Sequence, residues 1–100
     1  MTEINFEEYK VTVKGHAGYA EPGQDIVCSA VSTLVQTLAS TLKNMSHCLR
    51  GYSEQLESGE AVIWCRPKEC SKKEVDAIYK TIKTGLKGVA KAYPDFVKII

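Results

Sequence analysis

Apolar and polar residues alternate along the N-terminal segment with the period of a β-strand. From Tyr9 to Lys14 every second residue is apolar, which is typical of a strand with one buried face. Ile4 and Phe6 fall on the opposite parity, so the pattern slips around residues 7 and 8. This slip predicts a bulge or a short turn between two pieces of strand.

A long amphipathic helix is predicted after a glycine-rich loop. Residues 15–24 contain three Gly and one Pro, a content that excludes a regular element. Asp25 is placed to be the N-cap of the helix that follows. Apolar residues then recur at three- and four-residue intervals, namely Val27, Ala30, Val31, Leu34, Val35, Leu38, Leu42 and Met45. This spacing predicts a helix of about five turns.

The second half of the chain begins with a predicted hairpin. Leu49–Leu56 and Ala61–Arg66 flank the turn residues Ser58 and Gly59, and the second of these segments has β-branched and aromatic content. We therefore expect two antiparallel strands.

A second helix is predicted to open at Ser71, because Ser71 and Glu74 have the spacing of a capping box. Its apolar stripe consists of Val75, Ile78, Ile82, Leu86, Val89 and Tyr93. Pro94 ends the helix, and Phe96–Ile100 is predicted to form a short final strand.

These elements indicate a single domain over residues 1–100 of the α+β class. Two amphipathic helices would pack on a mostly antiparallel sheet to give two layers. A chain of 100 residues with 44% apolar content can bury one modest core, so an active site would be shallow or shared with a second subunit.

Positive charge gathers in the C-terminal third, although the formal net charge is only +1. Lys73, Lys80, Lys87 and Lys91 fall opposite the apolar stripe of the second helix, as expected of a solvated face. The same face offers the alternative function of a non-catalytic module that binds RNA or the ribosome. A catalytic function would require no direct nucleic-acid binding.

The chain shows neither a signal-like N-terminus nor an apolar run of membrane-spanning length, so we expect a cytoplasmic protein without membrane contact. Its four Cys are then expected to be reduced. His47, Cys48, Cys65 and Cys70 lack the spacing of zinc ligands, so no metal and no cofactor are predicted. Cys48 and Cys65 are interpreted as packing residues, and Cys70 as a loop residue.

Cys28 is the candidate nucleophile. With Asp25 as the N-cap it lies in the first helical turn, where unpaired N–H groups and the helix dipole favour an anion such as a thiolate. It lies at the margin of the apolar stripe beside Ser32, where a substrate could reach it. The alternative is that Cys28 is a small apolar residue near the core.

His16 is the candidate base, because the glycine-rich loop is long enough to fold it back over the start of the helix. Gly15, Gly18 and Gly23 would give this loop the freedom to open. Asp25 can serve as a cap or orient His16, and we favour the cap. Ser32 can donate a hydrogen bond to the thiolate or only face water, and first-turn N–H groups are candidate oxyanion donors.

Two motifs follow each other closely, Gly-His-Ala-Gly-Tyr-Ala at residues 15–20 and Gly-Gln-Asp-Ile-Val-Cys-Ser-Ala-Val-Ser at residues 23–32. Joined in this way, they resemble the signature of the ribosomal-processing cysteine protease family, Prp. The later hairpin, the second helix and the ending at residues 93–99 also resemble the family. Only fourteen residues precede Gly15, fewer than is usual in the family, so we expect a reduced N-terminal sheet edge.

The resemblance implies a thiol protease in which Cys28 is the nucleophile and His16 the base, with Asp25 and Ser32 as supporting polar residues. It implies a flexible loop from Gly15 to Gly23. The substrate it implies is the N-terminal extension of bacterial large-subunit ribosomal protein number twenty-seven, cut after an aromatic residue during ribosome biogenesis. It also implies a homodimer.

Overall fold

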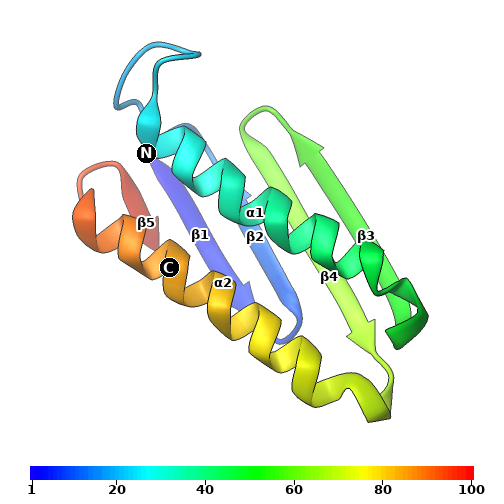
Figure 1. The fold of residues 1–100 in the computed structure, drawn as a ribbon. Helices are drawn as coiled ribbons and strands as arrows, with labels where there is room; N and C mark the ends of the chain where they lie inside the picture. The colour runs from blue at the N-terminus through cyan, green and yellow to red at the C-terminus, as the bar shows by residue number, and fades with distance from the viewer.

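A computed structural model describes residues 1–100, and in it both helices pack on one face of a single sheet (Figure 1). The helices are α1 (Ile26–Asn44) and α2 (Lys72–Ala92). The strands are β1 (Thr2–Glu7), β2 (Lys10–Lys14), β3 (Leu49–Glu57), β4 (Glu60–Pro67) and β5 (Val97–Ile99). Short 3₁₀ turns at Ser46–Cys48 and Glu69–Ser71 precede β3 and α2. The predicted two-layer α+β class is confirmed.

The five strands follow the order β3-β4-β2-β1-β5, and every neighbouring pair except β1 and β5 is antiparallel. The final strand pairs in parallel with β1, so Ile4 lies opposite Ile99. The reduced sheet edge expected at the N-terminus is therefore not found. β1 is an interior strand, and β5 forms the edge in its place.

Tyr9 is the clearest departure from the predicted strands. It was expected to start the second strand, but it lies in the tight turn between β1 and β2 with φ of 57°. Its carbonyl accepts the N–H of Cys65 at 3.0 Å and the hydroxyl of Tyr79 at 2.9 Å. These two bonds hold a bulky residue in the left-handed region, which such residues rarely adopt.

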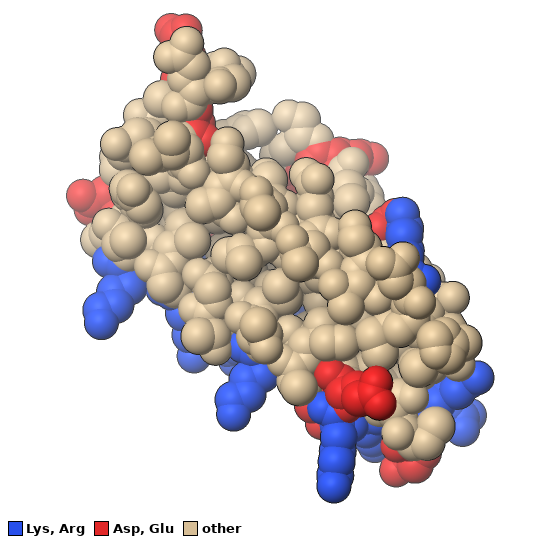
Figure 2. Space-filling model, in the orientation of Figure 1, with Lys and Arg blue, Asp and Glu red and all other residues tan.

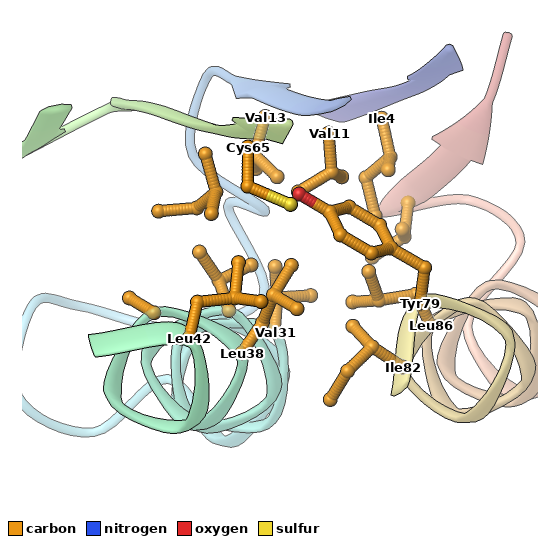
Figure 3. Close-up of a cluster of buried hydrophobic side chains, with 14 of the residues drawn as sticks. Ile4, Val11, Val13, Val31, Leu38, Leu42, Cys65, Tyr79, Ile82 and Leu86 are labelled. Carbon is orange, nitrogen blue, oxygen red and sulfur yellow. The ribbon is translucent and has the colours of Figure 1, made fainter. Parts of the chain in front are cut away.

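The core lies between the sheet and the two helices (Figure 3). Five residues of the predicted α1 stripe, Val27, Val31, Val35, Leu38 and Leu42, are buried, whereas Ala30, Leu34 and Met45 are only half-buried. The stripe of α2 needs one correction. Tyr79 is buried alongside Val75, Ile82 and Leu86, whereas Ile78, Val89 and Tyr93 are only half-buried. Tyr79 can enter the core because its hydroxyl has a partner in the Tyr9 carbonyl.

The predicted start of α2 is correct, but its capping box does not form. Ser71 makes no side-chain capping bond, and its hydroxyl lies 3.7 Å from Sγ of Cys70 instead. The 3₁₀ turn at Glu69–Ser71 leads directly into the helix, so Ser71 has φ −112° and ψ 3° and not the extended backbone of an N-cap.

Helix α1 has the length and hydropathy of a membrane span, with a mean hydropathy of 1.3 over eighteen residues. The expectation that no apolar run approaches membrane-spanning length is therefore wrong, judged by length and composition. A core helix of a globular domain passes the same test, and α1 buries one face on the sheet while Ser, Thr and Gln occupy the other. We assign it to the core.

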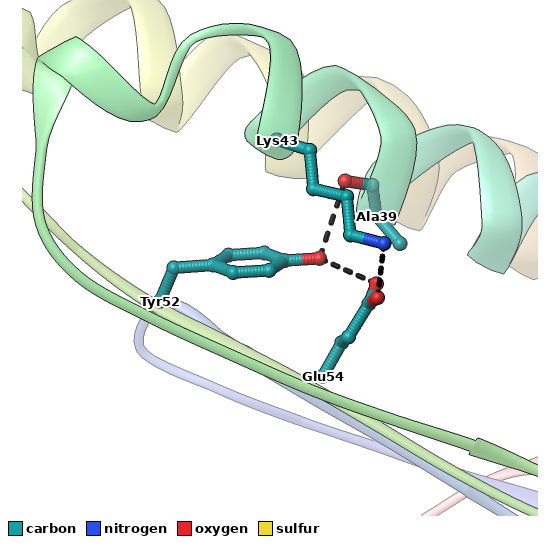
Figure 4. Close-up of polar contacts among 4 residues, drawn as sticks. All are labelled: Ala39, Lys43, Tyr52 and Glu54. Atoms are coloured by element: carbon teal, nitrogen blue, oxygen red, sulfur yellow. Dashed lines mark hydrogen bonds and ion pairs between the residues drawn. The ribbon is translucent and has the colours of Figure 1, made fainter.

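A polar cluster ties the end of α1 to β3 (Figure 4). The Tyr52 hydroxyl lies 2.6 Å from Oε2 of Glu54 and 3.2 Å from the carbonyl oxygen of Ala39. The Lys43 ammonium pairs with the same carboxylate. Lys43 and the Tyr52 hydroxyl hold the pKa of Glu54 below its ordinary value.

Charge is distributed as predicted for α2. Lys73, Lys80, Lys87 and Lys91 are all exposed. Figure 2 shows Lys and Arg side chains along the edge of the molecule below α2, while the surface over α1 is mostly uncharged.

Candidate active site

Asp25 organises the junction between the glycine-rich loop and α1. Its Oδ1 accepts the N–H groups of Val27 at 3.0 Å and Cys28 at 2.9 Å, which confirms the predicted N-cap. Its Oδ2 accepts the N–H groups of Tyr19 at 3.0 Å and Ala20 at 3.3 Å. The bond from Cys28, followed by those from Ala20 and Tyr19, lowers the pKa of Asp25 despite its burial. Both oxygens are thus used by backbone donors, which favours the cap over orientation of His16.

Cys28 is half-buried in the first turn of α1, as its position on the helical wheel predicts. The backbone N–H of Ala17 points at its Sγ, 3.4 Å away. This contact shows that the loop folds back over the start of the helix. The sulfur is thus contacted by a backbone donor from the loop.

His16 immediately precedes the residue that contacts the thiol. It is exposed, and its ring lies against Gly59 in the turn between β3 and β4. The N–H of the preceding residue, Gly15, donates to the carbonyl of Gly59 at 2.8 Å. No hydrogen bond joins the imidazole to Cys28 in this structure, but both residues line the same cleft.

This cleft has a volume of about 340 Å³ and contains His16, Cys28 and Ser32, all three predicted from the sequence. Its apolar lining comes from Val13, Val31, Val35, Leu56 and Ala61. Glu57 and Glu60, at the two ends of the β3–β4 turn, add negative charge to one side. The cleft therefore offers an apolar surface beside a thiol and an imidazole. Such a surface suits an apolar side chain of a bound peptide.

The three glycines predicted as hinges differ in their surroundings. All have positive φ, but only Gly18 and Gly23 have open space where a Cβ would stand. A Cβ on Gly15 would overlap the carbonyl oxygen of Met1. Gly15 is therefore needed for close packing against the N-terminus and not only for freedom of the loop.

An aromatic cluster holds the middle of the loop. Tyr19 packs edge-on against Tyr93 and Phe96, with ring centroids 5.6 Å and 5.2 Å apart. The loop is thus fixed at Gly15, Ala17 and Tyr19, and the segment around Pro22 extends beyond the body of the molecule (Figure 1).

The sequence did not predict two groups of the site, and it assigned the wrong role to the first-turn N–H groups. The N–H of Ala17 and the seat formed by Gly59 carry no sequence signal of their own, although Gly59 was recognised as a turn residue. The first-turn N–H groups were expected to be free oxyanion donors. The N–H groups of Val27 and Cys28 instead donate to the Asp25 side chain. The N–H of Ser29 donates to the Asp25 carbonyl.

The remaining cysteines lie outside the cleft. Cys65 is buried in β4, and burial raises the pKa of its thiol. Cys48 is half-buried and Cys70 is exposed, in agreement with their interpretation as packing and loop residues. No group of three His, Cys, Asp or Glu side chains is arranged to hold a metal ion.

The family model described as cysteine protease Prp matches residues 1–98, and the chain belongs to this family. The resemblance drawn from the joined motifs is thereby confirmed. Two curated relatives carry the name ribosomal processing cysteine protease Prp, one from Mycoplasma pneumoniae and one from Mycoplasma genitalium. Each is 46% identical over 35 residues, and this alignment spans 35% of the chain and 35% of the relative.

Solved structures of similar fold cover nearly the whole chain. The essential ribosomal processing protease Prp from S. aureus, in complex with a covalently linked product peptide, superimposes with a TM-score of 0.73 at 19% identity. This match covers 98% of the present chain and 94% of the other. Protein SMU.848 from Streptococcus mutans superimposes with a TM-score of 0.68 at 27% identity, covering 99% and 91%.

Proposed function

We propose that this chain is a cysteine endopeptidase in which Cys28 is the nucleophile and His16 the general base. The observation that carries this proposal is the shared cleft, which is lined by both residues and in which the Ala17 N–H points at the Cys28 sulfur. The family to which the chain belongs supports the same chemistry.

The reaction follows the usual course for a thiol and an imidazole. His16 takes the proton of Cys28, and the thiolate attacks the scissile carbonyl carbon. The tetrahedral intermediate collapses as the C–N bond breaks, and His16 returns the proton to the leaving amine. A water molecule, deprotonated by His16, then hydrolyses the thioester and regenerates the thiol. For the first transfer the Cys28 side chain must turn toward the imidazole on its seat at Gly59, a movement that substrate in the cleft would favour.

Each supporting residue has a structural task in this scheme. Asp25 fixes the start of α1 and the loop at Tyr19 and Ala20, so it sets where Ala17 and Cys28 meet. Ser32 lies one turn after Cys28 on the same cleft and is placed to donate a hydrogen bond to the thiolate or the peptide. The N–H of Ala17, which points at the sulfur, is our candidate oxyanion donor once the sulfur has bonded to the carbonyl carbon.

The proposed substrate is the N-terminal extension of bacterial large-subunit ribosomal protein number twenty-seven, cut after an aromatic residue. The Mycoplasma relatives are named for ribosomal processing, and the S. aureus protein has been seen with a product and with a substrate peptide. The apolar lining of the cleft has room for one large side chain.

We further propose a cytoplasmic homodimer, because the family resemblance implies a dimer and ribosomal proteins are cytoplasmic substrates. Sedimentation equilibrium tests the dimer directly. A particle of twice the chain mass is expected, and a monomer at micromolar concentration would contradict this part of the proposal.

The function is tested by incubating the chain with the tailed ribosomal protein and measuring its intact mass. The native chain should remove a mass equal to the extension, whereas Cys28→Ala should leave the protein whole. Cys70→Ala is the matched control, because Cys70 is a free cysteine exposed outside the cleft. Cleavage by Cys28→Ala at the native rate would refute the proposal.

The alternative function, a non-catalytic RNA- or ribosome-binding module, rests on the exposed lysines of α2. It predicts RNA binding that weakens steeply with salt and survives loss of Cys28. Replacing Lys80 and Lys87 by Gln would then abolish RNA binding, while our proposal expects the same variant to cleave the tailed protein normally.

A further inference from the structure

We propose that Gly59, at the tip of the β3–β4 hairpin, is a positioning residue for His16, an inference that rests on the proposed role of His16. Gly59 lies far from His16 in the sequence. It is joined to the loop only through the fold, at the point where the hairpin turn meets the residues before α1.

The imidazole lies directly on the Cα of Gly59. A Cβ placed on Gly59 would stand 2.9 Å from Nε2 of His16, and 3.5 Å and 3.6 Å from Cε1 and Cδ2. These three ring atoms face the same point, so the ring occupies the space that any other residue would fill with its side chain. Real Cβ atoms essentially never approach a nitrogen so closely.

The backbone around His16 is held on both sides of the ring. Before it, the N–H of Gly15 donates to the carbonyl of Gly59 at 2.8 Å. After it, the N–H of Ala17 contacts Sγ of Cys28 at 3.4 Å. His16 therefore bridges the hairpin turn and the thiol, and Gly59 supplies both the hydrogen-bond acceptor and the surface on which the ring rests.

Two separate requirements select glycine at this position. The φ of +79° favours glycine but is also adopted by Asn and Asp. The contact with the imidazole adds a second requirement, because the Cβ of any other residue, Asn and Asp included, would push the ring from its place. The backbone conformation alone would explain a turn, whereas the second requirement concerns His16. The ring is exposed and makes no hydrogen bond, so its packing against Gly59 bears directly on where it lies in the cleft.

The two requirements can be separated with alanine of either hand at position 59, which chemical synthesis of a 100-residue chain allows. L-Alanine places its methyl group on His16, and D-alanine accepts the positive φ and places its methyl group on the other side of the Cα. Gly88→Ala is the control, because a Cβ there meets nothing within 4 Å and Gly88 lies outside the cleft.

The measurements are kcat and KM for a peptide carrying the ribosomal extension, and the rate of Cys28 alkylation by iodoacetamide from pH 5 to 9. We expect kcat of the L-alanine chain to be about tenfold below that of the D-alanine chain, with KM within about twofold, because a displaced catalytic group costs turnover more than binding. The alkylation profile of the L-alanine chain should resemble that of His16→Ala. Equal values in the L- and D-alanine chains, or native values in the L-alanine chain, would overturn the proposal.

A second comparison covers a poorly folded variant. Removing the ring with His16→Ala gives the methyl group room, so Gly59→Ala should leave the alkylation rate unchanged in that background. The positive φ strains L-alanine with or without the ring, so the melting temperature should fall in both backgrounds. A change in the alkylation rate when Gly59→Ala is added to His16→Ala would overturn the proposal. If the native chain fails to cleave the peptide, the proposed function fails, but the alkylation profiles still decide whether Gly59 positions His16.

Discussion

The carboxylate of Asp25 accepts the backbone N–H of Cys28 at 2.9 Å through one oxygen and holds the loop at Tyr19 through the other, also by a backbone N–H. One buried side chain therefore fixes both walls of the junction in which the thiol lies. The helix cap and the arrangement of the cleft depend on the same group, so a change at Asp25 should affect stability and activity together.

Asp25→Ala should lower the melting temperature and reduce kcat/KM for peptide cleavage by about a hundredfold, because it frees the loop and the start of α1 at once. Asp25→Asn should fall between this variant and the native chain. Its amide oxygen can still cap Val27 and Cys28, but its NH₂ group cannot accept from Tyr19 and Ala20. Gln24→Ala is the neighbouring exposed control. An Asn variant with native kinetics would show that the loop needs no carboxylate.

The pH dependence of stability should carry the same signature. The pKa of Asp25 is lower in the folded chain than its ordinary value of 3.8, so the folded state gains stability from the carboxylate above that pH. The gain is lost as the pH falls through the lowered folded value. The difference in melting temperature between the native chain and Asp25→Asn should thus stay constant from pH 7 to about 4 and shrink below. A difference that shrinks between pH 7 and 5 would contradict this assignment.

Local pattern predicted most of the fold, because periodicity identifies which residues face a core and Asp25 marks a helix start. It could not place Tyr79, since a stripe drawn from aliphatic spacing omits a residue whose burial depends on a partner for its hydroxyl. The local pattern also placed Tyr9 in a strand and not in the turn. The two hydrogen bonds that hold its carbonyl come from distant residues, which a local pattern does not reveal.

The site divides in the same way. Cys28, His16 and Asp25 could be found because they lie within one loop-to-helix junction and form a joined motif. Gly59 could not, because its contact with His16 exists only once the β3–β4 hairpin has packed beside that junction. Sequence reasoning therefore located the reacting groups but not the surface on which one of them rests.

Tyr79→Phe should destabilise the chain by about 1 kcal/mol, the usual net value of one hydrogen bond. The loss stays small because the Tyr9 carbonyl keeps its bond from the Cys65 N–H. Urea unfolding measures it, with Tyr93→Phe as a control in which no hydroxyl bond is removed. A loss above about 3 kcal/mol would mean that the hydroxyl has a further task in the turn.

Glu54→Gln should cost about 0.5 to 1 kcal/mol, because Lys43 is mostly exposed and surface ion pairs are weak. A double-mutant cycle with Lys43→Ala isolates the pair, and the coupling should fall when salt is raised. A coupling that is unchanged in 1 M NaCl would contradict its assignment to an exposed ion pair.

The central claim is that the cleft around Cys28 and His16 makes this thiol reactive. Limiting iodoacetamide at pH 6.5, followed by peptide mass mapping, measures it for all four free cysteines in one sample. Exposure alone predicts that Cys70 is labelled first, because Cys70 is exposed whereas Cys28 is half-buried. The account predicts that Cys28 is labelled first, and that His16→Ala removes this preference. Faster labelling of Cys70 in the native chain, or an unchanged Cys28 rate in His16→Ala, would contradict it.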